Sequence, residues 1–205
     1  MTALAGIDLG RVADVEQIVR DWLAEPELLI LAGRWENGAV MEIVPRSPPI
    51  LTPERYEGRF AGLRDLLLDG EGHHVHMDLG RLTQVTYLVA PSVCFGFRPS
   101  FELRLHEAGA DPRQNFGLGF SVRRPYRNGL ASEAVMRYFS RFRSHHAAYS
   151  KLVSFAAIDG PSAVPNGEDF GWTDIVRVAL GRDTGDCRCA ADLARLIIDP
   201  VENTS

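Results

Sequence analysis

Three of the six histidines lie together in the segment GHHVHMDL, and their spacing suits a ligand site. If Gly72 to Leu79 is a β-strand, side chains alternate, and His74, His76 and Asp78 project from one face. Neutral imidazole is a good ligand for iron, zinc or copper, and two imidazoles on one strand face can share a site. The alternative is that these histidines form hydrogen bonds across a sheet or face solvent. The pattern predicts a metal or haem site without naming the ligand.

An arginine-rich cluster follows a later strand. Arg123, Arg124 and Arg127, with Tyr126 among them, form a basic and partly aromatic group. Guanidinium groups bind carboxylates through paired hydrogen bonds, so the cluster is a candidate clamp for carboxylates. Its other interpretation is a solvated strand end.

The cysteines give a weaker signal. Cys187 and Cys189 provide two thiolates at most, whereas a structural zinc site usually has four ligands. His74 and His76 would have to complete such a site. Three cysteines in total do not make a disulfide framework.

Composition limits the class of protein. The 205 residues suffice for one domain with a sizeable core, and 45% hydrophobic and 24% charged residues are typical of globular proteins. A net charge of −5 gives no reason to expect nucleic acid or an anionic membrane as a partner. We find no secretory leader and no apolar run near the roughly 18 residues of a membrane span. We therefore expect a reduced, cytoplasmic protein.

Periodicity predicts the elements of the first half. A helix is expected from about Ala13 to Ala24, because apolar residues recur there at helical spacing. Leu28–Trp35 and Ala39–Val44 read as a hairpin around Asn37-Gly38, and the proline-rich stretch that follows reads as an irregular connection. A second helix is expected from Thr52 to about Gly70, supported by a cap-like start and three leucines.

The second half alternates more clearly. We expect strands over 75–79, 84–90, 101–106, 116–122 and 152–158, and helices over 132–149, 172–180 and 190–198. Val135, Met136, Phe139 and Phe142 are expected to form the apolar face of the first of these helices. The residues from 159 to 171 read as a loop.

Three segments together resemble the cytosolic haem-utilisation family, the ChuX, HutX and HemS-like haem carriers. They are VMEIV at 40–44, GHHVHMDLGRLTQVTYLVAPSVCFGFRPSFELRL from residue 72, and FGLGFSVRR at 116–124. The resemblance covers roughly residues 12–149. It implies an α+β fold of curved antiparallel sheets with packed helices, a homodimer, and haem as the cofactor.

The resemblance also implies site residues. His76, with His74 as its nearest substitute, matches the family's strand-start histidine and would ligate the haem iron. Arg123 or Arg124 would bind the propionates. Because no histidine precedes His73, Tyr56 or Met41 would replace a ligand that some members take from the first half.

The resulting interpretation is a haem-carrier-like domain over residues 1–150, with residues 151–205 as an extension packed on it. The expected function is haem binding or trafficking in the cytoplasm, without turnover chemistry. The alternatives are a haem- or metal-dependent enzyme using His74, His76 and Asp78, and a ligand-free binding module that retains the fold. No nucleophile elbow, Walker loop or HExxH motif favours an enzyme.

Overall fold

The elements are taken from a computed structural model, which describes residues 7–34, 39–52, 56–69, 73–113, 117–159, 172–181, 187 and 189–198. The helices are α1 (Leu9–Leu23), α2 (Glu133–Ala148), α3 (Trp172–Leu180) and α4 (Ala190–Ile198), with short 3₁₀ turns at Gly58–Phe60 and Val93–Phe95. The strands are β1 (Leu28–Arg34), β2 (Ala39–Ile43), β3 (Ile50–Leu51), β4 (Leu63–Leu68), β5 (His73–Asp78), β6 (Gln84–Pro91), β7 (Pro99–His106), β8 (Leu118–Val122), β9 (Tyr126–Arg127), β10 (Leu130–Ala131) and β11 (Val153–Ala157).

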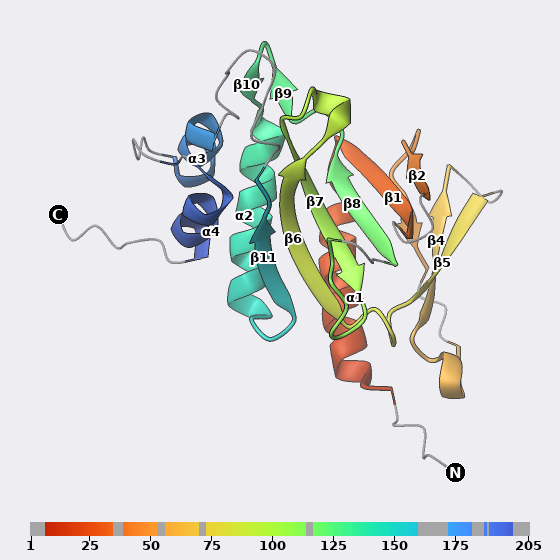
Figure 1. Ribbon diagram of the computed structural model, residues 1–205. Helices are drawn as coiled ribbons and strands as arrows, with labels where there is room; N and C mark the ends of the chain where they lie inside the picture. Colours follow the sequence, from red (N-terminus) through yellow and green to blue (C-terminus); the bar gives the residue numbers. More distant parts are fainter. Residues whose placement is uncertain are drawn as a thin grey trace.

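The largest element is a six-stranded sheet in the order β11-β6-β7-β8-β1-β2. Its pairs are antiparallel except the pair of β11 with β6, which is parallel. In Figure 1, α1 and α2 lie on one face of this sheet, and α3 and α4 lie beside α2. The strands predicted for this sheet are confirmed, including the hairpin of β1 and β2, and so are the helices predicted at the positions of α1, α2, α3 and α4. The turn predicted at Asn37-Gly38 lies outside the described residues.

Alternation along the strands builds the core. Tyr87, Phe101 and Phe120 are fully buried on the helix-facing side of β6, β7 and β8. The α1 helix adds Trp22, whose ring stacks on Phe120 with centroids 6.2 Å apart. All six apolar residues of this helix at the expected spacing are buried, and Asp8 caps its N-terminus by accepting a hydrogen bond from the Arg11 N–H.

A polar chain runs through this core. The Trp22 Nε1–H donates to the Tyr87 hydroxyl at 3.0 Å. That hydroxyl lies 2.6 Å from His145 Nδ1, and His145 Nε2 lies 2.9 Å from an Asp21 carboxylate oxygen. With Nε2 protonated, every group in the chain has a partner, which is what burial of polar atoms requires. His145 is thus a core residue, although its position in the last turn of α2 also suits a cation.

The helix predicted from Thr52 to Gly70 is wrong. Residues 63–68 form β4, which pairs with β3 on one side and with β5 on the other, in a separate three-stranded sheet. Leu66 and Leu68 alternate into the core, and so do Met77 and Leu79 from β5 and the turn after it. Leu63, Leu66 and Leu67 fit helical spacing, whereas the strand buries Leu66 and Leu68 on one face; pairing with β3 and β5 decided the structure.

The second long helix is confirmed with one correction. Met136, expected on the apolar face of α2, is 49% exposed, while Tyr138 takes a fully buried position. The chain then returns as β11, beside β6, and α3 and α4 pack against α2 and β11. Ile175 and Leu193 of these two helices belong to the same hydrophobic core as the sheets.

The protein therefore has an α+β fold in which antiparallel pairing dominates. One hydrophobic core joins the helices, the large sheet and the inner face of the small sheet. Within the described part of the chain, no helix is both long and apolar enough to cross a membrane.

Candidate functional site

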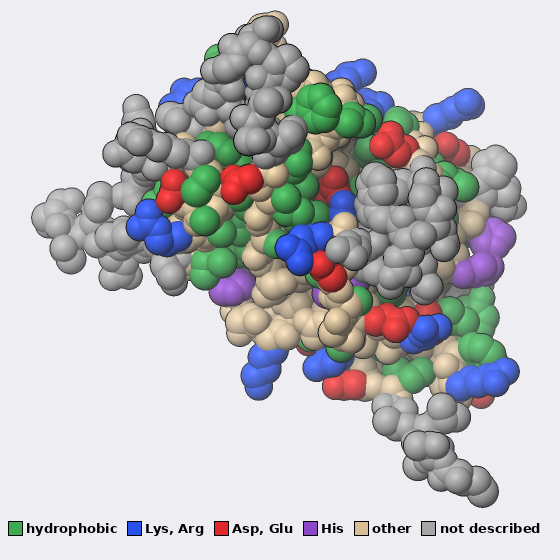
Figure 2. All heavy atoms as spheres, in the orientation of Figure 1, with side chains coloured by type: hydrophobic (Ala, Val, Ile, Leu, Met, Phe, Trp, Pro, Cys, Tyr) green, Lys and Arg blue, Asp and Glu red, His purple; other side chains and the backbone are tan. Residues whose placement is uncertain are grey.

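The predicted histidine face lies on the outside of the small sheet. Side chains of β5 alternate as expected: Met77 is buried, while His74 and His76 are exposed. The two imidazole rings are edge to face, with centroids 4.7 Å apart. Figure 2 shows histidine side chains at the molecular surface over β4 and β5. The sheet thus brings the two predicted ligands together where a large ligand can reach them.

A carboxylate on the neighbouring strand orients His76. Asp65 of β4 is the cross-strand partner of His76, and its Oδ1 lies 2.5 Å from His76 Nδ1. The Asp65 side chain is only 13% exposed, whereas that of His76 is 60% exposed. Since Asp65 occupies Nδ1, Nε2 is the nitrogen that would bind a metal. A carboxylate on the second ring nitrogen is the usual partner of a metal-binding histidine, because it orients the ring and raises its basicity.

Tyr56 belongs to the same network. Its hydroxyl donates to the other Asp65 oxygen, Oδ2, at 3.1 Å. The structure therefore connects Tyr56 and His76, two predicted ligands, through one carboxylate. Met41, the other substitute considered, is 63% exposed on β2 in the large sheet.

Asp78, the third residue of the predicted histidine face, stabilises the turn that follows β5. The Asp78 carboxylate accepts a hydrogen bond from the Gly80 N–H at 3.0 Å, and so closes the turn after β5. Asp78 and His76 line a cavity of about 180 Å³, together with Arg81. The Arg81 guanidinium pairs with Glu107 at 2.5 Å and its side chain is 66% exposed. Arg81 is therefore the arginine that accompanies His76.

The arginines expected to bind propionates lie elsewhere. Arg123 and Arg124 follow the end of β8, whereas the His76 cavity is lined by Leu118 at the start of that strand. An extended chain rises roughly 3.3 Å per residue, so five residues separate the two places by roughly 17 Å. Arg123 instead pairs with Glu27, the residue directly before β1, at 3.3 Å. The structure does not bring Arg123 and Arg124 together with His76.

The described residues contain no group of three or more His, Cys, Asp or Glu side chains arranged to hold a metal ion. Cys187 is buried in the core and its Sγ donates to the backbone oxygen of Cys189. This arrangement gives no support to a zinc site shared by the cysteines and the histidine face.

Sequence reasoning missed Asp65 and Arg81. Asp65 was hidden by the helix predicted over its segment, since only a strand at 63–68 places it opposite His76. A strand pattern at Leu66 and Leu68 was the available signal. Arg81 lies in a short turn, and the sequence pattern there does not predict which way its side chain points.

Comparison with models of known protein families finds no match to this chain, and comparison with curated protein sequences finds none.

Proposed function

We propose that this protein binds haem on the outer face of the small sheet, with His76 Nε2 as an axial ligand of the iron. One observation carries the proposal: the 2.5 Å contact between Asp65 and the Nδ1 atom of a mostly exposed His76. Such a pair supplies an oriented imidazole with raised basicity, as a haem protein requires.

Haem suits this face better than a bare metal ion does. A structural zinc site needs about four protein ligands, and the described residues offer no cluster of three or more. Haem iron already has the four porphyrin nitrogens, so one or two axial side chains complete its coordination. His74, with its ring 4.7 Å from that of His76, and Tyr56, bound to Asp65, are the next candidates for contact with the group.

The propionate partner in this proposal is Arg81, which lines the His76 cavity. It replaces Arg123 and Arg124 in that role. The cavity of about 180 Å³ holds only part of a porphyrin, so the macrocycle would lie across the exposed sheet face. The resemblance to haem carriers supports haem as the ligand and His76 as its axial residue, and it extends the proposal to a cytoplasmic homodimer that binds or transfers haem.

Titration of the purified protein with haemin, followed by absorbance, tests the proposal. We expect saturation near one haem per chain, with the band lost or shifted in His76→Ala. His74→Ala is the comparison variant: its imidazole has no carboxylate partner among the described residues, so its loss should weaken haemin binding less than the loss of His76 does. An unchanged titration in His76→Ala would remove His76 as the ligand.

Two further outcomes distinguish the alternatives. Incubation of the haem complex with a reductant under air leaves haem intact if the protein is a carrier, and yields a product if it is an enzyme. If wild-type protein gives no saturable band and contains no metal as isolated, a ligand-free binding module is the better account.

A further inference from the structure

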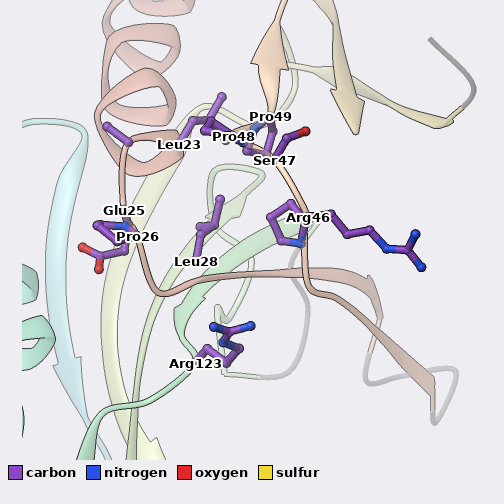
Figure 3. Close-up of a pocket in the computed structure, with 11 residues that line it drawn as sticks. Leu23, Glu25, Pro26, Leu28, Arg46, Ser47, Pro48, Pro49 and Arg123 are labelled. Atoms are coloured by element: carbon purple, nitrogen blue, oxygen red, sulfur yellow. The ribbon is translucent and has the colours of Figure 1, made fainter. Parts of the chain in front are cut away.

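A second cavity lies near the other end of β8 from the His76 cavity, between the end of α1 and the segment before β3. Its volume is about 340 Å³, within the range of small-molecule sites. We call it the proline pocket. Its walls are mainly apolar and come from Leu23, Pro26, Leu28, Pro45, Pro48 and Pro49 (Figure 3).

The rim of the proline pocket is fixed by a side chain from the small sheet. Asp69 follows β4 with a left-handed backbone (φ 52°), and its Oδ1 accepts hydrogen bonds from the N–H groups of Arg46 and Ser47. Two bonds to consecutive amides hold this turn of the proline-rich segment in one conformation. A pocket formed before its ligand arrives loses less entropy on binding.

The negative charge at the pocket is already neutralised. Glu25 is buried and its carboxylate accepts hydrogen bonds from Arg137 at 2.7 Å and Arg141 at 2.5 Å. Burial alone would raise the pKa of Glu25, but the hydrogen bonds from these two arginines outweigh it, and the pKa lies below its ordinary value. In Figure 3 the Glu25 carboxylate points away from Leu28. This ion pair is therefore structural.

The arginines around Glu27 are arranged differently. Arg123, Arg124 and Arg127 approach its carboxylate at 3.3, 3.9 and 4.0 Å, which are long distances for ion pairs. The three guanidinium groups thus share the Glu27 carboxylate, and none of them forms a short ion pair with it. Figure 3 shows that the Arg123 guanidinium points toward Leu28, while the Arg46 side chain extends away from the pocket. Arg123 is thus the cation that faces the apolar walls.

We propose that the proline pocket binds a small organic carboxylate with an apolar body. The apolar part would lie against Leu28 and the prolines, and the carboxylate would pair with Arg123. Glu27 would keep only its longer contacts with Arg124 and Arg127, at 3.9 and 4.0 Å, so it would compete with the ligand for Arg123. This site is separate from His76 and does not depend on haem binding.

Calorimetric titration with octanoate tests the site, with octanol as the uncharged probe of the same apolar shape. We expect saturable binding of octanoate, and binding of octanol at least about tenfold weaker, since one charge-assisted interaction is lost. Arg123→Gln should weaken octanoate binding by a similar factor. The matched control is Arg127→Gln, which also borders Glu27 but does not line the pocket.

A second variant guards against a folding artefact, because it changes affinity in the opposite direction. Glu27→Gln removes the carboxylate that competes for Arg123 and should strengthen octanoate binding severalfold. The proposal is overturned if wild-type protein shows no saturable binding of octanoate, if octanol binds equally well, or if Arg123→Gln binds as wild type does. Haemin titration of Arg123→Gln should match wild type, which separates failure here from failure of the haem proposal.

Discussion

Asp65 and His76 are direct partners across the β4–β5 pair, and Asp65 Oδ1 lies 2.5 Å from His76 Nδ1. Tyr56 holds the other oxygen of the same carboxylate. The carboxylate is largely buried while the imidazole is largely exposed. The fold therefore fixes the inner ring nitrogen and presents the outer one.

Replacement of Asp65 by Asn should lower haemin affinity by about 10- to 100-fold, because an outer carboxylate contributes about that much to metal binding by histidine. Absorbance titration measures the loss. Nitrogen NMR of His76 gives a readout that does not require haem: wild type should carry its proton on Nδ1, and Asp65→Asn should redistribute it. Asp78→Asn, on the same sheet, is the control. Equal affinity and an unchanged tautomer in Asp65→Asn would show that Asp65 does not position His76.

Tyr87→Phe should destabilise the protein by about 2 kcal/mol. The change removes one hydroxyl but leaves the Trp22 N–H and His145 Nδ1 without their partner, and unpaired buried groups cost about 1–3 kcal/mol. Urea denaturation measures the effect as a lower midpoint. Tyr126→Phe, which loses a single hydrogen bond to the Pro99 carbonyl, should cost less. Equal losses in the two variants would mean that the buried chain adds nothing.

His106 should make the protein less stable in mild acid. Burial holds the pKa of His106 below its ordinary value of 6.5. Its ring also lies 2.9 Å from the Thr86 hydroxyl and 3.0 Å from the Glu107 carbonyl. The unfolded chain therefore binds a proton at a higher pH than the folded chain does. The contribution of His106 to the free energy of unfolding is fully present above about pH 6.5. It falls as the pH drops toward the folded-state pKa, by at most about 1.4 kcal/mol per pH unit.

Denaturation midpoints between pH 5 and pH 7 check this expectation. In His106→Gln, the fall in stability below pH 6.5 should be smaller than in wild type. A parallel fall in both proteins would assign the acid sensitivity to other groups.

Gly62→Ala should destabilise the fold by a few kcal/mol, because a Cβ at this position would lie only 2.4 Å from the Gly80 backbone nitrogen. The Gly62 carbonyl oxygen accepts a hydrogen bond from the Leu79 N–H where the two segments meet. The two backbones therefore cannot separate without loss of this hydrogen bond. Gly10→Ala is a control of opposite sign: it lies in α1 with room for a methyl group and should add up to about 1 kcal/mol. Thermal unfolding compares the two, and a Gly62→Ala protein as stable as wild type would contradict the close approach.

Elements with a strong local period could be predicted from the sequence. The apolar stripe of α1 predicts a helix with one buried face, and the alternation at Leu103 and Phe120 predicts strands with one buried face. The structure confirms both. The prediction for residues 63–68 was wrong because Leu63, Leu66 and Leu67 satisfy helical spacing. The contacts that make this segment a strand, with β5 and at Gly80, come from residues farther along the chain.

The candidate site divides in the same way. Alternation alone placed His74 and His76 on one face. The partner of His76 could not be predicted without the pairing of β4. The arginine cluster was visible in the sequence, but Glu27 lies 96 residues before Arg123 and only the pairing of β8 with β1 brings them together.

The parallel pairing of β11 beside β6 has a consequence for biosynthesis. While the chain is being made, β6 already holds β7 on one side, yet its other edge is bare until residues 153–157 leave the ribosome. That edge runs along Val85, Tyr87 and Val89, and a bare apolar edge is a template for pairing with other chains. The nascent chain is therefore expected to be prone to aggregation until β11 covers this edge of β6.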